Sequence, residues 1–478
     1  MLFSSITFLY WFLPLVVALY FIIPRPRGSL LWRNLLLFVA SIVFYAWGEP
    51  LYVLVMIAQS LVGWASGLLI DRYRGKPVVR AILVISLVIE LSSLLFFKYT
   101  DFFIDNLNTL FHSQLGLLAL ALPLGISFYT FQILSYTIDL YRGKVSVQKN
   151  PLVFATYVTL FAQLIAGPIV RYSMVEEQLT SRTHSLAGFV KGVRRFALGL
   201  GKKVLLANTF GQLVVLTQAE LHGGGEQSVL FALLFLVGFS LQIYFDFSGY
   251  SDMAIGLGHM FGFTFPENFN YPYISRSLTE FWRRWHMTMS FWFRDYVYIS
   301  LGGNRVGKFR HLLNILIVWM VTGFWHGAGW NFILWGLYMA IFLILEKYFL
   351  QRLLEKIPRF FSHIYLVIFI MLSWILFESS SLAQAQELFL TLFGFGSSGL
   401  AGIASLYYLK SYIVLIVVAV IGCTPLPARA IGWFRDKTGL LGKRTLTILE
   451  PLFIAAILLV VTSFLVDGSF NPFIYFRF

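Results

Sequence analysis

Two histidines stand in sequence surroundings where an imidazole could do chemistry. His286 lies in LTEFWRRWHMTMSFWFRDY, and His326 lies in VTGFWHGAGWNFILWG. A neutral imidazole can take a proton from a hydroxyl group, which is the work of a general base. His326 belongs to a run, residues 311–345, that contains no Asp, Glu, Lys or Arg. Because an ionisable residue at membrane depth is expected to be functional, we predict a chemical role for His326.

Three glycines lie close to His326, namely Gly323, Gly327 and Gly329. Small residues leave space around the imidazole, as a substrate channel would require. The alternative is a histidine that packs between helices and binds a backbone carbonyl. We favour the substrate channel.

The segment around His286 has the pattern of an amphipathic helix. Ser277 and Glu280 have the S-x-x-E spacing of a capping box, which predicts that a helix begins there. Apolar residues follow at helical spacing: Leu278, Phe281, Trp282, Trp285, Met289, Trp292 and Phe293. The charged residues on the opposite side are Glu280, Arg283, Arg284 and Arg294. We therefore expect an interfacial helix at the cytoplasmic boundary, with His286 on the border of its apolar stripe, where structural and functional roles are equally compatible with the spacing.

Several residues near the histidines are candidates for substrate binding. Arg283 and Arg284 could bind the phosphates of a cytoplasmic donor, although membrane topology alone also predicts basic residues there. Asp246 and Tyr250 could orient a histidine or a hydroxyl substrate, or satisfy each other structurally. The other candidates adjoin the histidines in sequence: Trp285, Trp325 and Asn331.

Cys423 is the only cysteine, so the chain has no intramolecular disulfide and no paired-cysteine metal site. Its neighbours Thr424 and Pro425 are typical of the end of a membrane span, and we predict an inert thiol and no metal.

The composition requires that these residues be positioned within a membrane. Hydrophobic residues make up 58% of the chain and charged residues only 12%, and the mean hydropathy is +0.77. Residues 1–24, 50–70, 150–170 and 311–345 carry no Asp, Glu, Lys or Arg, and one crossing needs roughly 20 such residues. We predict an all-α, polytopic integral membrane protein of about 9–11 transmembrane helices, with additional re-entrant and interfacial helices.

The net charge of +14 reflects membrane topology, because the basic residues lie in short loops between apolar runs. No nucleic-acid partner is expected. Arg25, Arg27 and Arg33 follow the first run, whereas the turn at Gly48–Pro50 has no basic residue. This alternation predicts an extracytoplasmic N-terminus.

Two apolar runs have unusual lengths or ends. Residues 151–169 lie between Lys149 and Arg171 and contain Gly167 and Pro168, which predicts a re-entrant segment. Residues 311–345 are too long for one span and lie between Arg310 and Lys347, which predicts a helical hairpin bent at residues 327–329. His326 would then lie at the bend, about 20 Å along the helix from Arg310.

Five segments resemble the membrane-bound O-acyltransferase family, in particular its bacterial branch for alginate O-acetylation and teichoic acid D-alanylation. In order they are FYTFQILSYTIDLYRG, QLIAGPIVRY, DFSGYSDMAIGLGHMFGF, PENFNYPYISRSLTEFWRRWHMTMSFWFRDYVYISLGGNR and TGFWHGAGWNFILWG. They span about residues 120–340, and we expect one membrane domain over residues 1–478 with this motif-bearing catalytic region. The terminal NPFIYFRF is similar to the alginate-type members. Ala162 stands where the branch often has proline, which leaves the local backbone shape open.

The resemblance implies an essential catalytic histidine at His326 and a second, tunnel-lining histidine at His286. It implies no bound cofactor and an acyl thioester such as acetyl-CoA as the donor substrate. The implied partners are an extracytoplasmic Ser-hydrolase-like acetyl-transfer protein, an exported polysaccharide and the lipid bilayer. The implied location is the bacterial inner (cytoplasmic) membrane.

These observations favour an O-acetyltransferase that passes an acetyl group across the membrane to an exported, alginate-like polysaccharide. One alternative is D-alanyl transfer to teichoic acid, with the donor on a carrier protein. The other is a transporter or flippase without acyl chemistry, which the broken helices and intramembrane polar residues would also fit.

Overall fold

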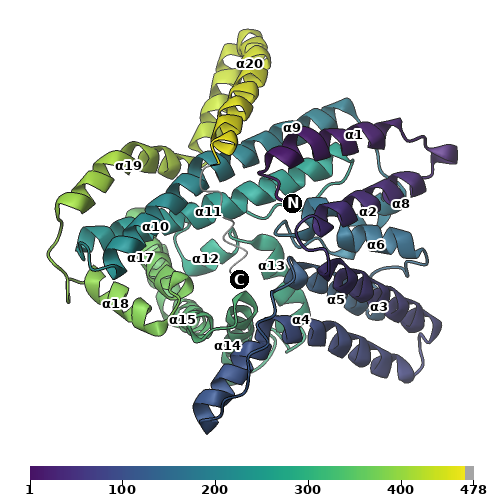
Figure 1. Ribbon diagram of the computed structural model, residues 1–478, viewed down its shortest axis with the longest axis horizontal. Helices are drawn as coiled ribbons and strands as arrows, with labels where there is room; N and C mark the ends of the chain where they lie inside the picture. The colour runs from purple at the N-terminus through teal and green to yellow at the C-terminus, as the bar shows by residue number, and fades with distance from the viewer. Residues whose placement is uncertain (469–478) are drawn as a thin grey trace. The chain divides into compact units, whose positions relative to one another are not determined.

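The protein is all-helical over residues 1–468, the part of the chain that the computed structural model describes (Figure 1). The terminal NPFIYFRF lies outside the described residues. The chain forms two compact units. Unit 1 contains residues 1–196, 251–267 and 294–296, and unit 2 contains residues 197–250, 268–293 and 297–478. The predicted all-α fold is confirmed, and one domain over the whole chain stays a prediction.

Unit 1 is built mainly from helices of the N-terminal third. They are η1 (Phe8–Phe12), α1 (Leu13–Ile22), η2 (Pro26–Gly28), α2 (Leu31–Ala46), α3 (Tyr52–Arg72), α4 (Val78–Phe111), α5 (Ile126–Tyr141), α6 (Pro151–Thr159), α7 (Phe161–Leu164) and α8 (Tyr172–Thr180). Helices α3, α4 and α5 pack against one another, and α2 packs against α6 (Figure 1). Two further helices, α9 (Leu186–Gly201) and α11 (Val229–Met260), contain residues of both units.

The segment predicted to be re-entrant is a broken helix. Helix α6 stops at Thr159, Leu160 has φ −51° and ψ 112°, and α7 has only four residues. All residues from 156 to 170 are buried. Surrounding side chains therefore cover the broken backbone, which is the condition that a membrane places on such a segment.

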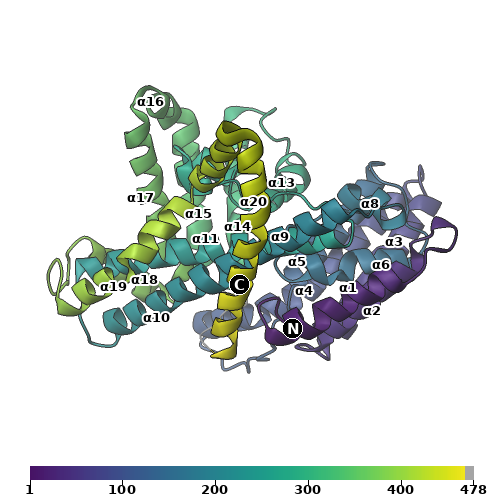
Figure 2. The ribbon, with the colours of Figure 1, turned by 90° about the horizontal axis from the view of Figure 1, so that it is seen from above.

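Unit 2 holds both histidines of interest. Its helices are η3 (Lys202–Ala207), α10 (Asn208–His222), η4 (Pro272–Ile274), α12 (Leu278–Trp282), α13 (Met287–Phe293), α14 (Lys308–His326), α15 (Trp330–Leu345), η6 (Glu346–Leu350), α16 (Gln351–Lys356), α17 (Arg359–Glu378), α18 (Leu382–Leu392), α19 (Ile403–Gly422) and α20 (Leu426–Val466). A further helix, η5 (Arg294–Tyr298), crosses the unit boundary. Figure 2 shows α15, α16 and α17 following one another in green. Helix α20 is interrupted at Gly439, where φ is +56°.

Eight helices within residues 1–468 are long and apolar enough to cross a membrane. They are Tyr52–Arg72, Val78–Phe111, Leu186–Leu221, Val229–Met260, Trp330–Lys356, Arg359–Glu378, Ile403–Gly422 and Leu426–Val466. Two shorter apolar helices, Phe8–Ile22 and Leu31–Ala46, add to them. The protein is therefore a multi-pass membrane protein, while the number of spans and the side on which the N-terminus lies stay predictions.

Candidate active site

Helices α14 and α15 form the predicted hairpin and pack side by side (Figure 1). The bend falls at residues 327–329, between the end of α14 and the start of α15. At the other end of the hairpin, Nδ1 of His311 lies 2.6 Å from the Tyr348 hydroxyl, and Lys347 donates to Nε2 of His311 at 3.1 Å. The first turn of α14 therefore meets the residues that follow α15. His326 lies at the bend, as predicted.

Most glycines of the hairpin lie at close contacts between helices and do not border the channel that we expected from them. A Cβ atom at Gly323 would overlap the carbonyl oxygen of Phe332, and one at Gly327 would overlap the Phe332 ring. Gly336 is equally tight against the carbonyl oxygen of Trp319. Gly323, Gly327 and Gly336 therefore allow the two helices to approach closely, whereas Gly329 lines a cavity, so the channel interpretation stays a prediction for that glycine.

Three aromatic rings enclose the imidazole of His326. Its centroid lies 4.9 Å from Trp325, 5.1 Å from Trp335 and 5.2 Å from Phe377. The His326 side chain is buried, at 6% exposure. The imidazole is thus held among the rings of Trp325, Trp335 and Phe377, which we call the aromatic chamber. Water competes little there for hydrogen bonds to the imidazole nitrogens.

A cavity of about 490 Å³ adjoins this chamber, and Phe377 contacts both the cavity and His326. The cavity has polar and apolar walls, with Gly329 and Asn331 from the bend and Ser379 from the end of α17 among its lining residues. Asn331 donates from Nδ2 to the carbonyl oxygens of Leu376 and Ser379, at 3.3 and 3.0 Å. Asn331 therefore holds the cavity wall together, and its predicted contact with substrate stays a prediction.

His286 does not lie on a continuous helix, so that prediction is wrong. Helix α12 ends at Trp282, α13 begins at Met287, and His286 between them has φ +42°. This left-handed conformation is strained for a residue with a Cβ. The break is held by a distant segment, because Met287 donates its N–H to the Asn268 carbonyl at 3.0 Å.

The beginning and the apolar side of this segment agree with the prediction. Ser277 caps α12 by accepting the N–H of Glu280 at 3.0 Å. The carboxylate of Glu280 accepts the N–H of Arg276 instead of completing a capping box, and it also pairs with Arg284. All members of the apolar stripe are buried, namely Leu278, Phe281, Trp282, Trp285, Met289, Trp292 and Phe293. The stripe packs into the protein, and its place at a membrane boundary stays untested.

Asn268 fixes the orientation and tautomer of His286. The Asn268 side-chain oxygen accepts the backbone N–H of Thr288 at 3.3 Å and its hydroxyl at 2.8 Å, so this atom is an acceptor. Nδ1 of His286 lies 3.0 Å from the same oxygen and must be the protonated nitrogen. Nε2 therefore carries the lone pair, and it is buried without a hydrogen-bond partner among residues 1–468.

Burial also sets the charge of His286. The side chain is 0% exposed, and desolvation lowers its pKa to about 3. The imidazole is consequently neutral at pH 7. Its Nε2 can accept a hydrogen bond or a proton from a molecule that enters the site.

The ring of Trp325 lies near both histidines. The Trp325 ring centroid is 6.4 Å from His286 and 4.9 Å from His326. On its other side, His286 contacts Phe247 at 4.6 Å, edge to face. Two histidines that are 40 positions apart in the sequence thus belong to one aromatic chamber.

Glu346 was missed by the sequence analysis, although it holds α12 to the hairpin. Its two carboxylate oxygens accept the backbone N–H groups of Leu278 and Thr279, at 2.7 and 2.8 Å. Trp282, at the other end of α12, packs against Trp319 and Trp335 at 4.8 and 5.7 Å. Glu346 is the first acidic residue after Asp295 and stands in an apolar stretch. An isolated carboxylate in such surroundings indicates a specific partner, so the sequence could have identified this residue.

The remaining predicted residues have varied surroundings. Asp246 forms a buried ion pair with Lys203 at 2.7 Å, which favours the structural alternative for this carboxylate. Tyr250 is buried, Arg283 is exposed, and Arg284 donates to Glu280 and to the carbonyl of Asn270. Trp285 packs against Phe269, Phe281 and Tyr273 beneath His286. Their contact with substrate stays a prediction.

A multi-pass membrane protein that holds two buried histidines among the same aromatic rings has two imidazoles available for proton transfer. The sequence pattern of the family described as MBOAT, membrane-bound O-acyltransferase, matches residues 142–384. The protein belongs to this family and is an O-acyltransferase.

Similar proteins match between about half and all of the chain. The probable alginate O-acetylase AlgI of Azotobacter vinelandii is 36% identical over 100% of both chains. The peptidoglycan O-acetyltransferase of Helicobacter pylori is 34% identical over 81% of this chain and 79% of its own. The teichoic acid D-alanyltransferase of Streptococcus thermophilus is 34% identical over only 48% of this chain and 58% of its own. The predicted likeness to alginate-type members is confirmed.

Proposed function

We propose that this protein takes an acetyl group from acetyl-CoA in the cytoplasm and passes it across the inner membrane for O-acetylation of an exported polysaccharide. The observation that carries the proposal is the pair of buried histidines whose rings both lie near the ring of Trp325. The names of the relatives that match along most of the chain, alginate O-acetylase and peptidoglycan O-acetyltransferase, favour acetyl as the acyl group and a glycan as the final acceptor.

His326 acts as the general base in this proposal. It removes a proton from the acceptor hydroxyl, whose oxygen attacks the thioester carbonyl. The carbon–sulfur bond then breaks, an oxygen ester forms, and the proton leaves with the CoA thiol. The 490 Å³ cavity beside Phe377 offers the acceptor a polar approach to the chamber.

His286 supports the donor side of the reaction. With Nδ1–H held by Asn268, its Nε2 accepts a hydrogen bond from an N–H or O–H group of the substrate. Arg283 is exposed and available to a phosphate of the donor. The oxygen ester formed at His326 is the donor for an extracytoplasmic Ser-hydrolase-like protein, which breaks that ester, returns the first hydroxyl with its proton, and forms the ester on the polymer. The N-terminus lies outside the cytoplasm.

The test measures acetyl ester on the exported polymer by mass spectrometry in cells that carry His326→Ala. We expect ester to fall to background while the variant protein is inserted at the wild-type level. The matched control is His112→Asn, at an exposed histidine with φ +52° that asparagine also tolerates. Wild-type ester levels in His326→Ala would exclude the proposed role.

D-alanyl transfer is the second candidate, favoured by the 34% identity to the teichoic acid D-alanyltransferase. The same measurement separates the two, because acetyl and D-alanyl esters differ in mass. D-alanine on the polymer that disappears in His326→Ala would select this alternative.

A further inference from the structure

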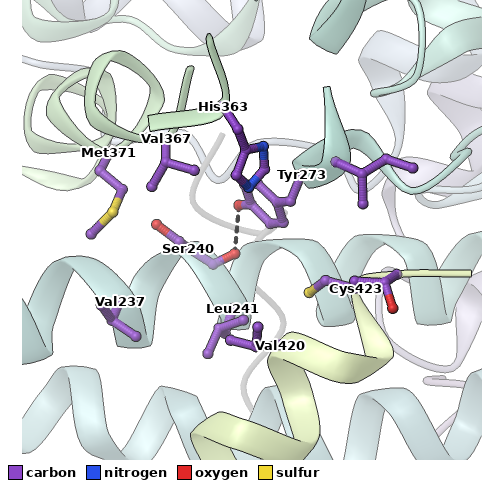
Figure 3. Close-up of a pocket in the computed structure, with 11 residues that line it drawn as sticks. Val237, Ser240, Leu241, Tyr273, His363, Val367, Met371, Val420 and Cys423 are labelled. Atoms are coloured by element: carbon purple, nitrogen blue, oxygen red, sulfur yellow. Dashed lines mark hydrogen bonds between the residues drawn. The ribbon is translucent and has the colours of Figure 1, made fainter. Parts of the chain in front are cut away.

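Unit 2 contains a second cavity, of about 260 Å³, with Tyr273 among its lining residues (Figure 3). Its walls come from α11, η4, α17 and the C-terminal end of α19. Most of the lining is apolar, including Val237, Leu241, Val367, Met371, Val420 and Cys423. No step of acetyl transfer requires this cavity.

The polar side chains of the cavity already have partners. Tyr273 donates to the carbonyl of Ser240 at 2.7 Å, which is the dashed line in Figure 3. The hydroxyls of Ser240 and Thr424 donate to carbonyls within their own segments, each at 2.7 Å. Nδ1 of His363 lies 3.1 Å from the carbonyl of Ser275. Because these donors are used by the backbone, the walls present hydrocarbon and sulfur to an occupant, and a hydrocarbon is the chemistry that fits.

The cavity adjoins surfaces that are suited to face lipid. Helices α17 and α19 are both candidate membrane spans. Ile368 on α17 is 48% exposed, and Val417 and Ile421 on α19 are 51% and 45% exposed. A bilayer surrounds such faces with acyl chains, so a hydrocarbon occupant is present at very high concentration.

Two exposed arginines are close in the sequence to lining residues of the cavity. Arg359 precedes the lining residue His363 by one helical turn, and Arg429 follows Cys423 by six positions. Guanidinium groups beside a membrane bind lipid phosphates. We propose that this cavity holds an acyl chain of an anionic phospholipid, with its phosphate at the end marked by Arg359 and Arg429.

The bound acyl chain would contact Tyr273, which packs against the residue before His286. Tyr273 lines the cavity, and its ring lies 6.1 Å from Trp285, the residue before His286. This lipid is separate from the acyl group that the proposed reaction transfers, so the proposal stands independently of the proposed function.

The only cysteine provides a native reporter, because Cys423 lines the cavity. Purified, delipidated protein is treated with N-phenylmaleimide, with and without added palmitoyl-oleoyl phosphatidylglycerol. We expect the lipid to slow labelling of Cys423 several-fold, and phosphatidylcholine to slow it less. The control carries Cys423→Ser and Val417→Cys, which places the thiol on the exposed face of α19. Equal slowing of both thiols, or no slowing of Cys423, would overturn the proposal.

Native mass spectrometry of protein extracted from phosphatidylglycerol nanodiscs gives a second test. Val367→Trp fills the cavity, whereas Ile368→Trp adds the same bulk on the outward side of the same helix. We expect Val367→Trp to lose at least one retained phosphatidylglycerol that the wild type and Ile368→Trp keep. Equal lipid retention by both variants, each eluting as folded protein, refutes the assignment, and so does a retained quinone in place of phospholipid.

Discussion

The two histidines of the chamber are held in different ways. His326 ends a regular helix, and its position follows from the close packing of α14 on α15 and from three surrounding rings. His286 lies on a break between two short helices, with φ +42°, and the hydrogen bond that its Nδ1–H donates to Asn268 determines which nitrogen is protonated. The first position depends on the shape of a hairpin, and the second depends on specific polar contacts.

The comparison shows that one site can position two side chains in different ways, one by packing and the other by hydrogen bonds. Packing places the His326 ring, whereas the Asn268 amide gives His286 a single tautomer at the cost of a strained backbone. Substitutions should therefore act on His326 through lost chemistry and on His286 through lost orientation.

The largest effect is expected from removing the base. In proteoliposomes supplied with acetyl-CoA, His326→Ala should slow acyl transfer by about 10²–10⁴-fold, the usual contribution of a general base. His286→Ala should slow it less, because binding and orientation are lost while the base remains. An equal or larger loss in His286→Ala would reverse the roles assigned to the two histidines.

A smaller effect is expected from Asn268, which tests orientation directly. Asn268→Asp places a carboxylate 3.0 Å from Nδ1 of His286 and should raise the pKa of that imidazole from its low value. Transfer should slow by about 10–100-fold, as for other residues that orient a functional imidazole, and the slowing should deepen as the pH falls. A variant that is slower by the same factor at every pH would indicate a purely structural role for Asn268.

Glu346 tests the attachment of α12 to the hairpin. Glu346→Gln replaces one acceptor of the Leu278 and Thr279 N–H groups by a donor, which leaves a buried N–H unsatisfied. We expect the free energy of unfolding in detergent to fall by about 1–3 kcal/mol. The control is Glu355→Gln, at an exposed residue of α16, which should change stability little. If Glu346→Gln unfolds as the control does, the carboxylate does not hold α12 in place.

The smallest effect concerns pH. Burial lowers the pKa of His286 to about 3, whereas an imidazole in the unfolded chain titrates near 6.5. As the pH falls, the unfolded chain therefore binds a proton before the folded chain does, and stability decreases below about pH 6.5. From pH 7 to pH 6 this group should lower the free energy of unfolding by about 0.7 kcal/mol. His286→Gln should remove this contribution from the pH dependence of the free energy of unfolding, measured between pH 7 and pH 6. An unchanged pH dependence would contradict a buried, neutral imidazole at His286.

The position of His326, at the end of a regular helix, was predictable from the sequence. The position of His286, at a helix break, was only partly predictable. The bend beside His326 and the cap at Ser277 are local signals, because glycines, chain charges and the S-x-x-E spacing act on neighbouring residues. The break at His286 depends on Asn268, and the start of α12 depends on Glu346, which is 68 positions from Leu278. Helical periodicity alone favoured one continuous helix, and tertiary hydrogen bonds overrode it.

The glycines near His326 have a role that the sequence alone does not determine. A glycine fits an open channel and a close helix contact equally well, and only the position of a second helix decides between them. Gly323 faces the backbone of α15, so the contact is the correct interpretation here. The large cavity near the bend has walls from α10, α17 and α18 as well, and no local pattern brings these segments together.

The contact between Gly323 and α15 also determines the register of the hairpin. Residues four apart share a face of a helix, so a stroke of α14 toward the bend by one turn, about 5.4 Å, would bring Trp319 against the carbonyl of Phe332, where Gly323 has no room even for a methyl group. Such a stroke is therefore blocked while the two helices stay in contact. Rotation of side chains such as Phe377, or displacement of the hairpin as one body, would open the chamber without breaking this contact.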